Sequence, residues 1–202
     1  MATRRHLLAS SAAVAATAWV APSVITLDRV AAAAVSGTAE IPQLGPGAAW
    51  FDPAPPNLAV GAVESDTETP VFLEVSCFEL DAPIVVNRST AGAFNGNSNQ
   101  NTVIPAGTRI ASYFAHGDKL TIPGRLTGSM TFTSQTILGL IYETAQFNAT
   151  SFLEIPGTNY VYGGAEGGDN MTLALTPGAN TVTWDLNFGP VTDQIRVITT
   201  CS

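Results

Sequence analysis

The sequence predicts an all-β protein, an antiparallel two-sheet β-sandwich that is jelly-roll-like and follows an N-terminal signal helix. Three observations indicate this fold class. Apolar and polar residues alternate with period two in several short segments, turn residues such as Gly, Pro and Asn separate these segments, and no convincing amphipathic helix follows the first 34 residues. About eight to ten such strands are typical of two packed antiparallel sheets.

The first 34 residues have the organisation of an export signal peptide. Arg4 and Arg5 precede an apolar run at residues 7–20, and the small residues 32–34 predict cleavage before Val35. The run is too short and too rich in alanine for a stable membrane span. The paired arginines fit a twin-arginine signal, and the general secretory route fits equally well. We therefore expect a protein that is secreted or held at the cell surface.

Two regions are expected after cleavage. Residues 35–70 form a Pro/Gly-rich N-terminal region, and residues 71–202 form the β-sandwich domain. Six prolines in the first region cannot donate to a strand ladder, so we expect only one edge strand there, at residues 58–63. The mature chain is long enough to bury a core of its own as one domain.

Strand patterns begin at residues 71–78, where both faces carry apolar side chains, which predicts a strand covered on both sides. Short strands are predicted at residues 84–86 and 109–116. The Gly- and Asn-rich residues 90–101 predict a mobile loop, and residues 104–108 predict a turn.

In the second half of the chain, the continuous apolar run at residues 137–141 predicts a buried central strand. One helical turn is expected within residues 147–155, and residues 159–168 form a glycine-rich loop. Trp184 lies in the clearest alternating segment and is predicted to point into the core. Further strands are predicted at residues 126–132, 171–175, 181–188 and 195–200.

Cys77 and Cys201 are the two cysteines of the chain, and in an oxidising compartment such a pair predicts a disulfide. The bond requires that the strands near both residues be neighbours or face each other. The alternative is two buried free thiols.

The charge balance excludes two classes of partner. The net charge is −8, and removal of the signal would leave five basic and fifteen acidic residues. Nucleic acids and anionic lipids are bound through Lys and Arg, so neither is expected as a partner.

Five strings in the second half occur in a recognisable order. They are Pro-Ala-Gly-Thr-Arg-Ile-Ala-Ser-Tyr-Phe-Ala-His-Gly-Asp at 105–118, Leu-Thr-Gly-Ser-Met-Thr-Phe at 126–132, Ile-Leu-Gly-Leu-Ile at 137–141, Pro-Gly-Thr-Asn-Tyr at 156–160 and Asp-Gln-Ile-Arg-Val-Ile-Thr at 193–199. This stretch resembles exported bacterial β-sandwich ectodomains that often carry sorting anchors of the PEP-CTERM type. The resemblance implies a place at the bacterial surface or in an extracellular matrix, and no assigned activity. Because the sequence ends at Ser202 without an anchor, we expect release from the cell.

Aromatic residues beside loops are candidates for sugar binding, since a flat ring stacks on a pyranose face. The candidates are Trp50, Phe51, Tyr113, Tyr160 and Tyr162. The alternative is that these rings belong to the core.

His116 and Asp118 are two residues apart on one predicted strand, so their side chains share a face and are candidate ligand-binding residues. The pair has the residue types of general-base chemistry, and a structural His–Asp hydrogen bond at the sheet edge is the alternative. Glu166 and Asp169 of the glycine-rich loop offer oxygen ligands of the kind that calcium takes, and a solvated loop is the alternative. No other cofactor is expected.

These features favour a secreted, non-catalytic binding or structural module of the bacterial cell surface or extracellular matrix. Its expected partner is an extracellular glycan or a cell-surface protein. The alternative is a secreted hydrolase acting on polysaccharide, but no Gly-x-Ser-x-Gly string is present and one histidine remains after cleavage.

Overall fold

The computed structural model describes residues 38–95, 99–121, 123–162, 170–176, 179–188 and 192–201. Two helical segments lie in these ranges, α1 (Thr144–Ala149) and the 3-10 turn η1 (Ser151–Leu153), and neither is long and apolar enough to cross a membrane. The described chain is therefore mostly β, which confirms the predicted class. Its strands are β1 (Gln43–Leu44), β2 (Ala48–Trp50), β3 (Thr69–Glu79), β4 (Ile84–Val86), β5 (Gly92–Phe94), β6 (Thr102–Ile104), β7 (Arg109–Gly117), β8 (Gly124–Phe132), β9 (Ile137–Ile141), β10 (Asn170–Thr176), β11 (Ala179–Phe188) and β12 (Asp193–Thr200).

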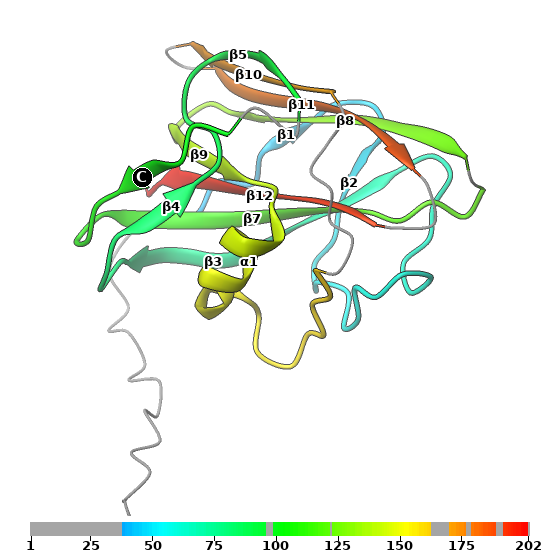
Figure 1. Ribbon diagram of the computed structural model, residues 1–202, viewed down its shortest axis with the longest axis horizontal. Coiled ribbons are helices and arrows are strands. Elements are labelled where there is room, and N and C mark those ends of the chain that lie inside the picture. Colours follow the sequence, from blue (N-terminus) through cyan, green and yellow to red (C-terminus); the bar gives the residue numbers. More distant parts are fainter. Residues whose placement is uncertain are drawn as a thin grey trace, which may run out of the picture. The chain divides into compact units, whose positions relative to one another are not determined.

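Most of these strands belong to two five-stranded sheets (Figure 1). The first sheet has the order β1-β8-β11-β10-β5, and the second has the order β2-β3-β7-β12-β9. Strands β4 and β6 form a separate two-stranded ladder. The ladders of the described strands are antiparallel with one exception, the parallel pairing of β2 with β3.

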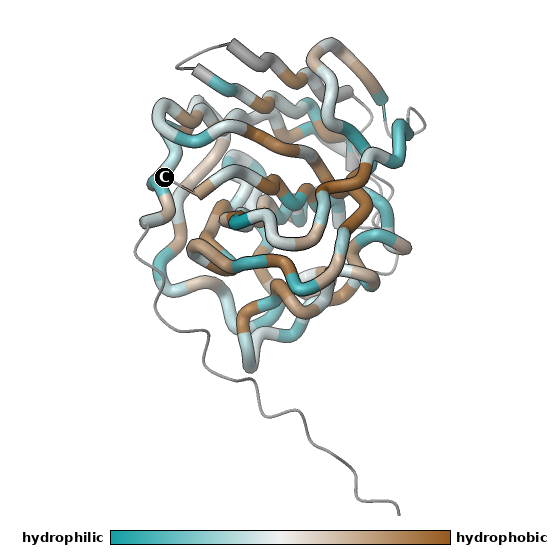
Figure 2. Tube along the Cα trace, turned by 90° about the vertical axis from the view of Figure 1, so that its left-hand side faces the viewer, coloured by the Kyte–Doolittle hydropathy of each residue, from teal (hydrophilic) through white to brown (hydrophobic). Residues whose placement is uncertain are grey.

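One buried cluster is shared by the two sheets. Met130 of β8 and Trp184 of β11 come from the first sheet, and Tyr113 of β7 and Val197 of β12 come from the second. Trp184 is 3% exposed, and its indole N–H donates to Oγ1 of Thr69 at 3.2 Å. The predicted inward direction of Trp184 is therefore confirmed. The hydrophobic stretches cross the middle of the trace in Figure 2.

The second sheet is buried on its other face as well. Phe114 of β7 and Ile198 of β12 belong to a second cluster, which also contains Phe147 of α1. The rings of Phe114 and Phe147 lie 5.7 Å apart, so α1 packs against β7 (Figure 1). Coverage on both faces explains why apolar residues occupy both sides of these strands, as predicted for residues 71–78.

Cys77 and Cys201 form a disulfide, as the sequence predicted, with Cα atoms 5.3 Å apart. Strands β3 and β12 are not adjacent, because β7 lies between them. Phe78 and Thr200 both pair with Ile110, so the bond crosses β7 near its first residues. Cys77 lies where the register of β3 shifts, and its φ of 52° is in the left-handed region. The cysteines therefore connect second neighbours in one sheet, rather than the adjacent or facing strands that were predicted.

The expected edge strand at residues 58–63 is wrong. This segment consists of turns and bends, with Gly61 at a φ of 80°, and Leu58 is fully buried. The regular structure of the Pro/Gly-rich region lies earlier, in β1 and β2. These two short strands pair with β8 and β3, so the region contributes an edge strand to each sheet.

Three further expectations are corrected. Part of the loop predicted at residues 90–101 is a strand, β5, because β10 provides it with a ladder partner. The segment before residue 105 is also a strand, β6, rather than part of a turn. Strand β9 is buried as predicted but stands at the end of its sheet rather than in the centre. Its outer side is covered because Leu140 exchanges backbone hydrogen bonds with Asn87 and Arg88.

Candidate functional site

Two of the predicted ligand-binding tyrosines lie inside the protein. Tyr113 is fully buried, and its hydroxyl lies 2.6 Å from the carbonyl oxygen of Glu40 and 2.8 Å from Oε1 of Gln135. Burial raises the pKa of Tyr113 above its ordinary value. Tyr162 is 8% exposed, and its ring stacks on Phe147 with centroids 4.8 Å apart. In this conformation neither ring has a face that a saccharide can reach.

Tyr160 is half-buried, and its ring meets Phe114 edge-on at 5.3 Å. Its hydroxyl lies 3.4 Å from the backbone nitrogen of Ile155. Burial raises the pKa of Tyr160 as well. This ring therefore helps to hold the segment that follows η1 against the second sheet.

His116 and Asp118 have different partners. His116 is fully buried, and its Nδ1 lies 3.1 Å from the side-chain amide nitrogen of Gln194. Asp118 is 3% exposed, and its Oδ2 accepts a hydrogen bond from the backbone N–H of Gly61 at 2.8 Å. Strand β7, which carries His116, is in the interior of its sheet rather than at an edge. Burial lowers the pKa of His116 to about 4, so the imidazole is neutral at pH 7.

The two candidate calcium ligands, Glu166 and Asp169, lie outside the described residues. Within the residues that the structure describes, no group of three or more His, Cys, Asp or Glu side chains is placed to hold a metal ion. The calcium prediction therefore stays a prediction.

A buried ion pair, which was not among the predicted site residues, connects β3 and β12. Arg196 and Glu74 have fully buried side chains, and Nε and Nη2 of Arg196 donate to the two carboxylate oxygens at 2.6 and 2.7 Å. Nη1 donates to the hydroxyl and carbonyl oxygens of Thr150 at 2.6 and 3.3 Å, and Nη2 also reaches the Tyr162 hydroxyl at 3.1 Å. All five N–H groups of the guanidinium are thus paired. Burial alone would lower the pKa of Arg196, but the Glu74 carboxylate raises it above its ordinary value.

This hydrogen-bond network holds elements of the fold together. It joins β3 and β12 to the segment of α1, η1 and Tyr162, and each polar group in it has a protein partner. The sequence signal was a charged residue, Arg196, between two apolar residues of a predicted strand, Ile195 and Val197. A buried charge in such a place requires a buried partner.

Trp50, one of the predicted residues, lines an open cavity. We call this cavity the Trp50 groove; it has a volume of about 440 Å³ and is lined by Ile41, Trp50, Phe51, Asp52, Pro53, Ala54, Leu73 and Ile155. This volume lies within the usual range of small-molecule sites, roughly 300–1,000 Å³.

Strand β2 positions the Trp50 groove. Trp50 pairs with Val71 in the parallel ladder, and the backbone N–H of Phe51 donates to the carbonyl of Val71 at 2.8 Å. The Trp50 ring also packs against the buried ring of Tyr113, with centroids 6.5 Å apart. One side of the indole is thereby supported by the core, and Asp52 follows at the exposed margin of the groove.

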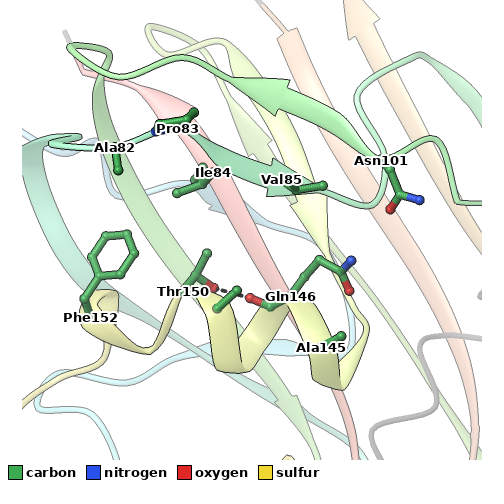
Figure 3. A pocket seen from close by; sticks show the side chains of 10 residues that line it. Ala82, Pro83, Ile84, Val85, Asn101, Ala145, Gln146, Thr150 and Phe152 are labelled. Carbon is green, nitrogen blue, oxygen red and sulfur yellow. Dashed lines mark hydrogen bonds between the residues drawn. The ribbon is translucent and has the colours of Figure 1, made fainter.

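A second cavity lies between β4 and α1 (Figure 3). Its volume is about 390 Å³, and its lining has no charged side chain. Phe152, which is 40% exposed, lies toward one end, and Asn101 and Gln146 lie toward the other. Within the described part of the chain, Oε1 of Gln146 has no hydrogen-bond partner. The hydroxyl of the lining residue Thr150 already accepts a hydrogen bond from Arg196. The rest of the lining offers carboxamide groups and apolar surface.

The Trp50 groove is the better candidate for saccharide binding, because it combines a supported indole ring with a carboxylate able to accept hydrogen bonds from hydroxyl groups. Sequence reasoning identified Trp50 from its residue type but missed Asp52. Comparison of the chain with protein-family models, with curated proteins and with solved structures finds no match.

Proposed function

We propose that this protein is a secreted, non-catalytic binding module of the bacterial cell surface or extracellular matrix, and that it binds saccharide in the Trp50 groove. The observation that carries the proposal is the placement of Trp50 and Phe51 in an open groove beside Asp52. An aromatic ring and a few polar groups on a concave surface are what a pyranose requires.

The disulfide supports the extracellular part of the proposal. Bonds such as that between Cys77 and Cys201 form and persist in oxidising compartments. The signal-like residues 1–34, with Arg4 and Arg5, point in the same direction.

The finer fold is also part of the proposal. We assign the two five-stranded sheets to a jelly-roll-like sandwich, since both contribute side chains to one buried cluster. The resemblance to exported bacterial ectodomains agrees with this assignment.

The buried histidine supports a binding role over a hydrolytic one. A triad of the serine-hydrolase kind needs an imidazole that reaches the substrate, whereas His116 is fully buried and neutral. Polysaccharide hydrolysis by two carboxylates stays an outcome of the test below.

The test measures binding of the purified chain to a neutral oligosaccharide, cellohexaose, by isothermal titration calorimetry. Truncation of an anchoring aromatic residue commonly costs 2 kcal/mol or more, so Trp50→Ala should weaken binding by at least about tenfold. Phe152→Ala, which removes an aromatic ring from the cavity of Figure 3, should leave the affinity unchanged.

Because Trp50 also packs on Tyr113, a second variant separates binding from folding. Trp50→Phe keeps an aromatic ring and should retain most of the binding. Equal affinities of the parent and Trp50→Ala would overturn the proposal. Release of new reducing ends from the saccharide would overturn its non-catalytic part.

A further inference from the structure

We propose that the Trp50 groove prefers saccharides with free amino groups over neutral or acidic ones. This inference rests on saccharide binding at the groove and specifies the chemistry of the ligand. Its starting point is the lining, in which Asp52 is the one charged side chain and is exposed to solvent. A protonated amino group beside this carboxylate would form a charge-assisted hydrogen bond.

The indole ring of Trp50 also favours a positively charged ligand. The face of a tryptophan ring attracts ammonium groups through its quadrupole, and this attraction is stronger for Trp than for Tyr or Phe. The two groups of the groove that can recognise a sugar, Trp50 and Asp52, therefore both favour a cation.

Asp52 is the charge that the groove itself presents. Glu40 and Glu154 directly precede the lining residues Ile41 and Ile155, but the hydroxyls of Thr133 and Ser134 donate to the Glu40 carboxylate and the Tyr162 hydroxyl donates to that of Glu154. Among the described residues, no Lys or Arg lines the groove. The one lysine of the chain, Lys119, is paired with Asp66 at 2.6 Å.

The whole chain has a net charge of −8, so an anionic polymer such as a polyuronate is repelled by the groove and by the overall field. A basic peptide could pair with the Asp52 carboxylate, but it has no pyranose face to stack on Trp50. The combination of ring and carboxylate therefore selects an amino sugar.

The expected effect is modest because Asp52 is exposed. Solvent-exposed ion pairs contribute up to about 1 kcal/mol, which corresponds to an affinity ratio of about two to five. The preference should decrease as salt is added, since salt screens exposed charges.

The experiment compares oligomers of equal length with the purified chain. The probes are the hexamer of glucosamine, the hexamer of N-acetylglucosamine, cellohexaose, hexagalacturonate and hexalysine. Affinities are measured by calorimetry at about pH 5.5, which lies between the ordinary pKa values of an aspartate and of an amino group. The glucosamine hexamer should bind two- to fivefold more tightly than its N-acetylated counterpart, and hexagalacturonate should bind most weakly.

Asp52→Asn should abolish this preference while binding of cellohexaose persists. Asp81→Asn is the matched control, because it makes the same change in net charge at an exposed position beyond the far end of β3. If the preference survives in Asp52→Asn, or if Asp81→Asn reduces it equally, the inference is wrong and neutral saccharide binding stands. Hexalysine binding as tightly as the glucosamine hexamer would also overturn it. Absence of binding to every saccharide would remove the proposed function itself.

Discussion

The protein contains two ion pairs with similar bidentate geometry and very different burial. Arg196 donates to Glu74 at 2.6 and 2.7 Å, and Arg125 donates to Asp185 at 2.8 and 2.5 Å. The side chains of the first pair are 0% exposed, whereas those of the second are 53% and 38% exposed. Substitution of one carboxylate in each pair by its amide therefore isolates the effect of burial.

We predict that Glu74→Gln lowers the free energy of unfolding by about 3–5 kcal/mol, because it leaves the buried Arg196 charge uncompensated. Ser112, which donates to Glu74 at 2.6 Å, also loses a charged acceptor. Asp185→Asn should cost less than about 1 kcal/mol, since water solvates Arg125 when its partner is neutral. Whole domains are stable by only about 5–15 kcal/mol, so the first change should be visible as a large shift of the transition.

The assay is urea unfolding followed by circular dichroism, with both variants and the parent compared at the same pH. A loss below about 1 kcal/mol for Glu74→Gln, similar to that of Asp185→Asn, would refute the reasoning, because it would mean that water reaches Arg196 in the native state.

Three other predictions concern the core, the disulfide and pH. Trp184→Ala should cost about 3–5 kcal/mol through the cavity that it leaves, and a melting temperature within a few degrees of the parent would contradict this. Reduction of the bond between Cys77 and Cys201 should raise the intact mass by about 2 Da, and thiol labelling without reductant should find neither cysteine free; the associated loss of stability is at most about 5 kcal/mol for a loop of this length. Burial lowers the pKa of His116 to about 4, below its ordinary 6.5, so the unfolded chain binds the additional proton between these values. Stability should therefore fall by up to about 3 kcal/mol as the pH drops through this window, and urea unfolding of His116→Gln across the same pH series should show a smaller loss.

The longer strands could be predicted from the sequence because their side chains report which face is buried. Trp184 follows period two within β11, and its burial could be predicted from that pattern alone. The three-residue strands β5 and β6 could not be predicted in this way. Strand β4 is as short, but its residues Ile-Val-Val form a continuous apolar run, whereas Gly92–Phe94 and Thr102–Ile104 adjoin Gly, Asn and Pro residues that are typical of loops. Their ladders depend on pairing with β10 and β4.

Strand β9 shows how a continuous apolar run can mislead. Such a run indicates burial on both faces, and the sequence predicted a central strand on that basis. In the structure a strand at the end of its sheet meets the same condition, because Val86 packs over Gly139 and the backbone of Arg88 bonds to Leu140. Burial follows from coverage, and coverage does not require a place in the middle of a ladder.

The candidate site was only half predictable, and the reason lies in the direction of β2. Residue type alone made Trp50 and Tyr113 equal candidates, but Tyr113 is on a central strand between two layers, whereas Trp50 is on an edge strand. The parallel pairing of Trp50 with Val71 directs the next residues along the edge of the second sheet, where Asp52 joins the same groove. A three-residue strand next to a proline-rich segment contains no pattern that distinguishes parallel from antiparallel pairing. Asp52 could therefore become a candidate only after the ladder was known, and its role depends on that pairing as much as on its own charge.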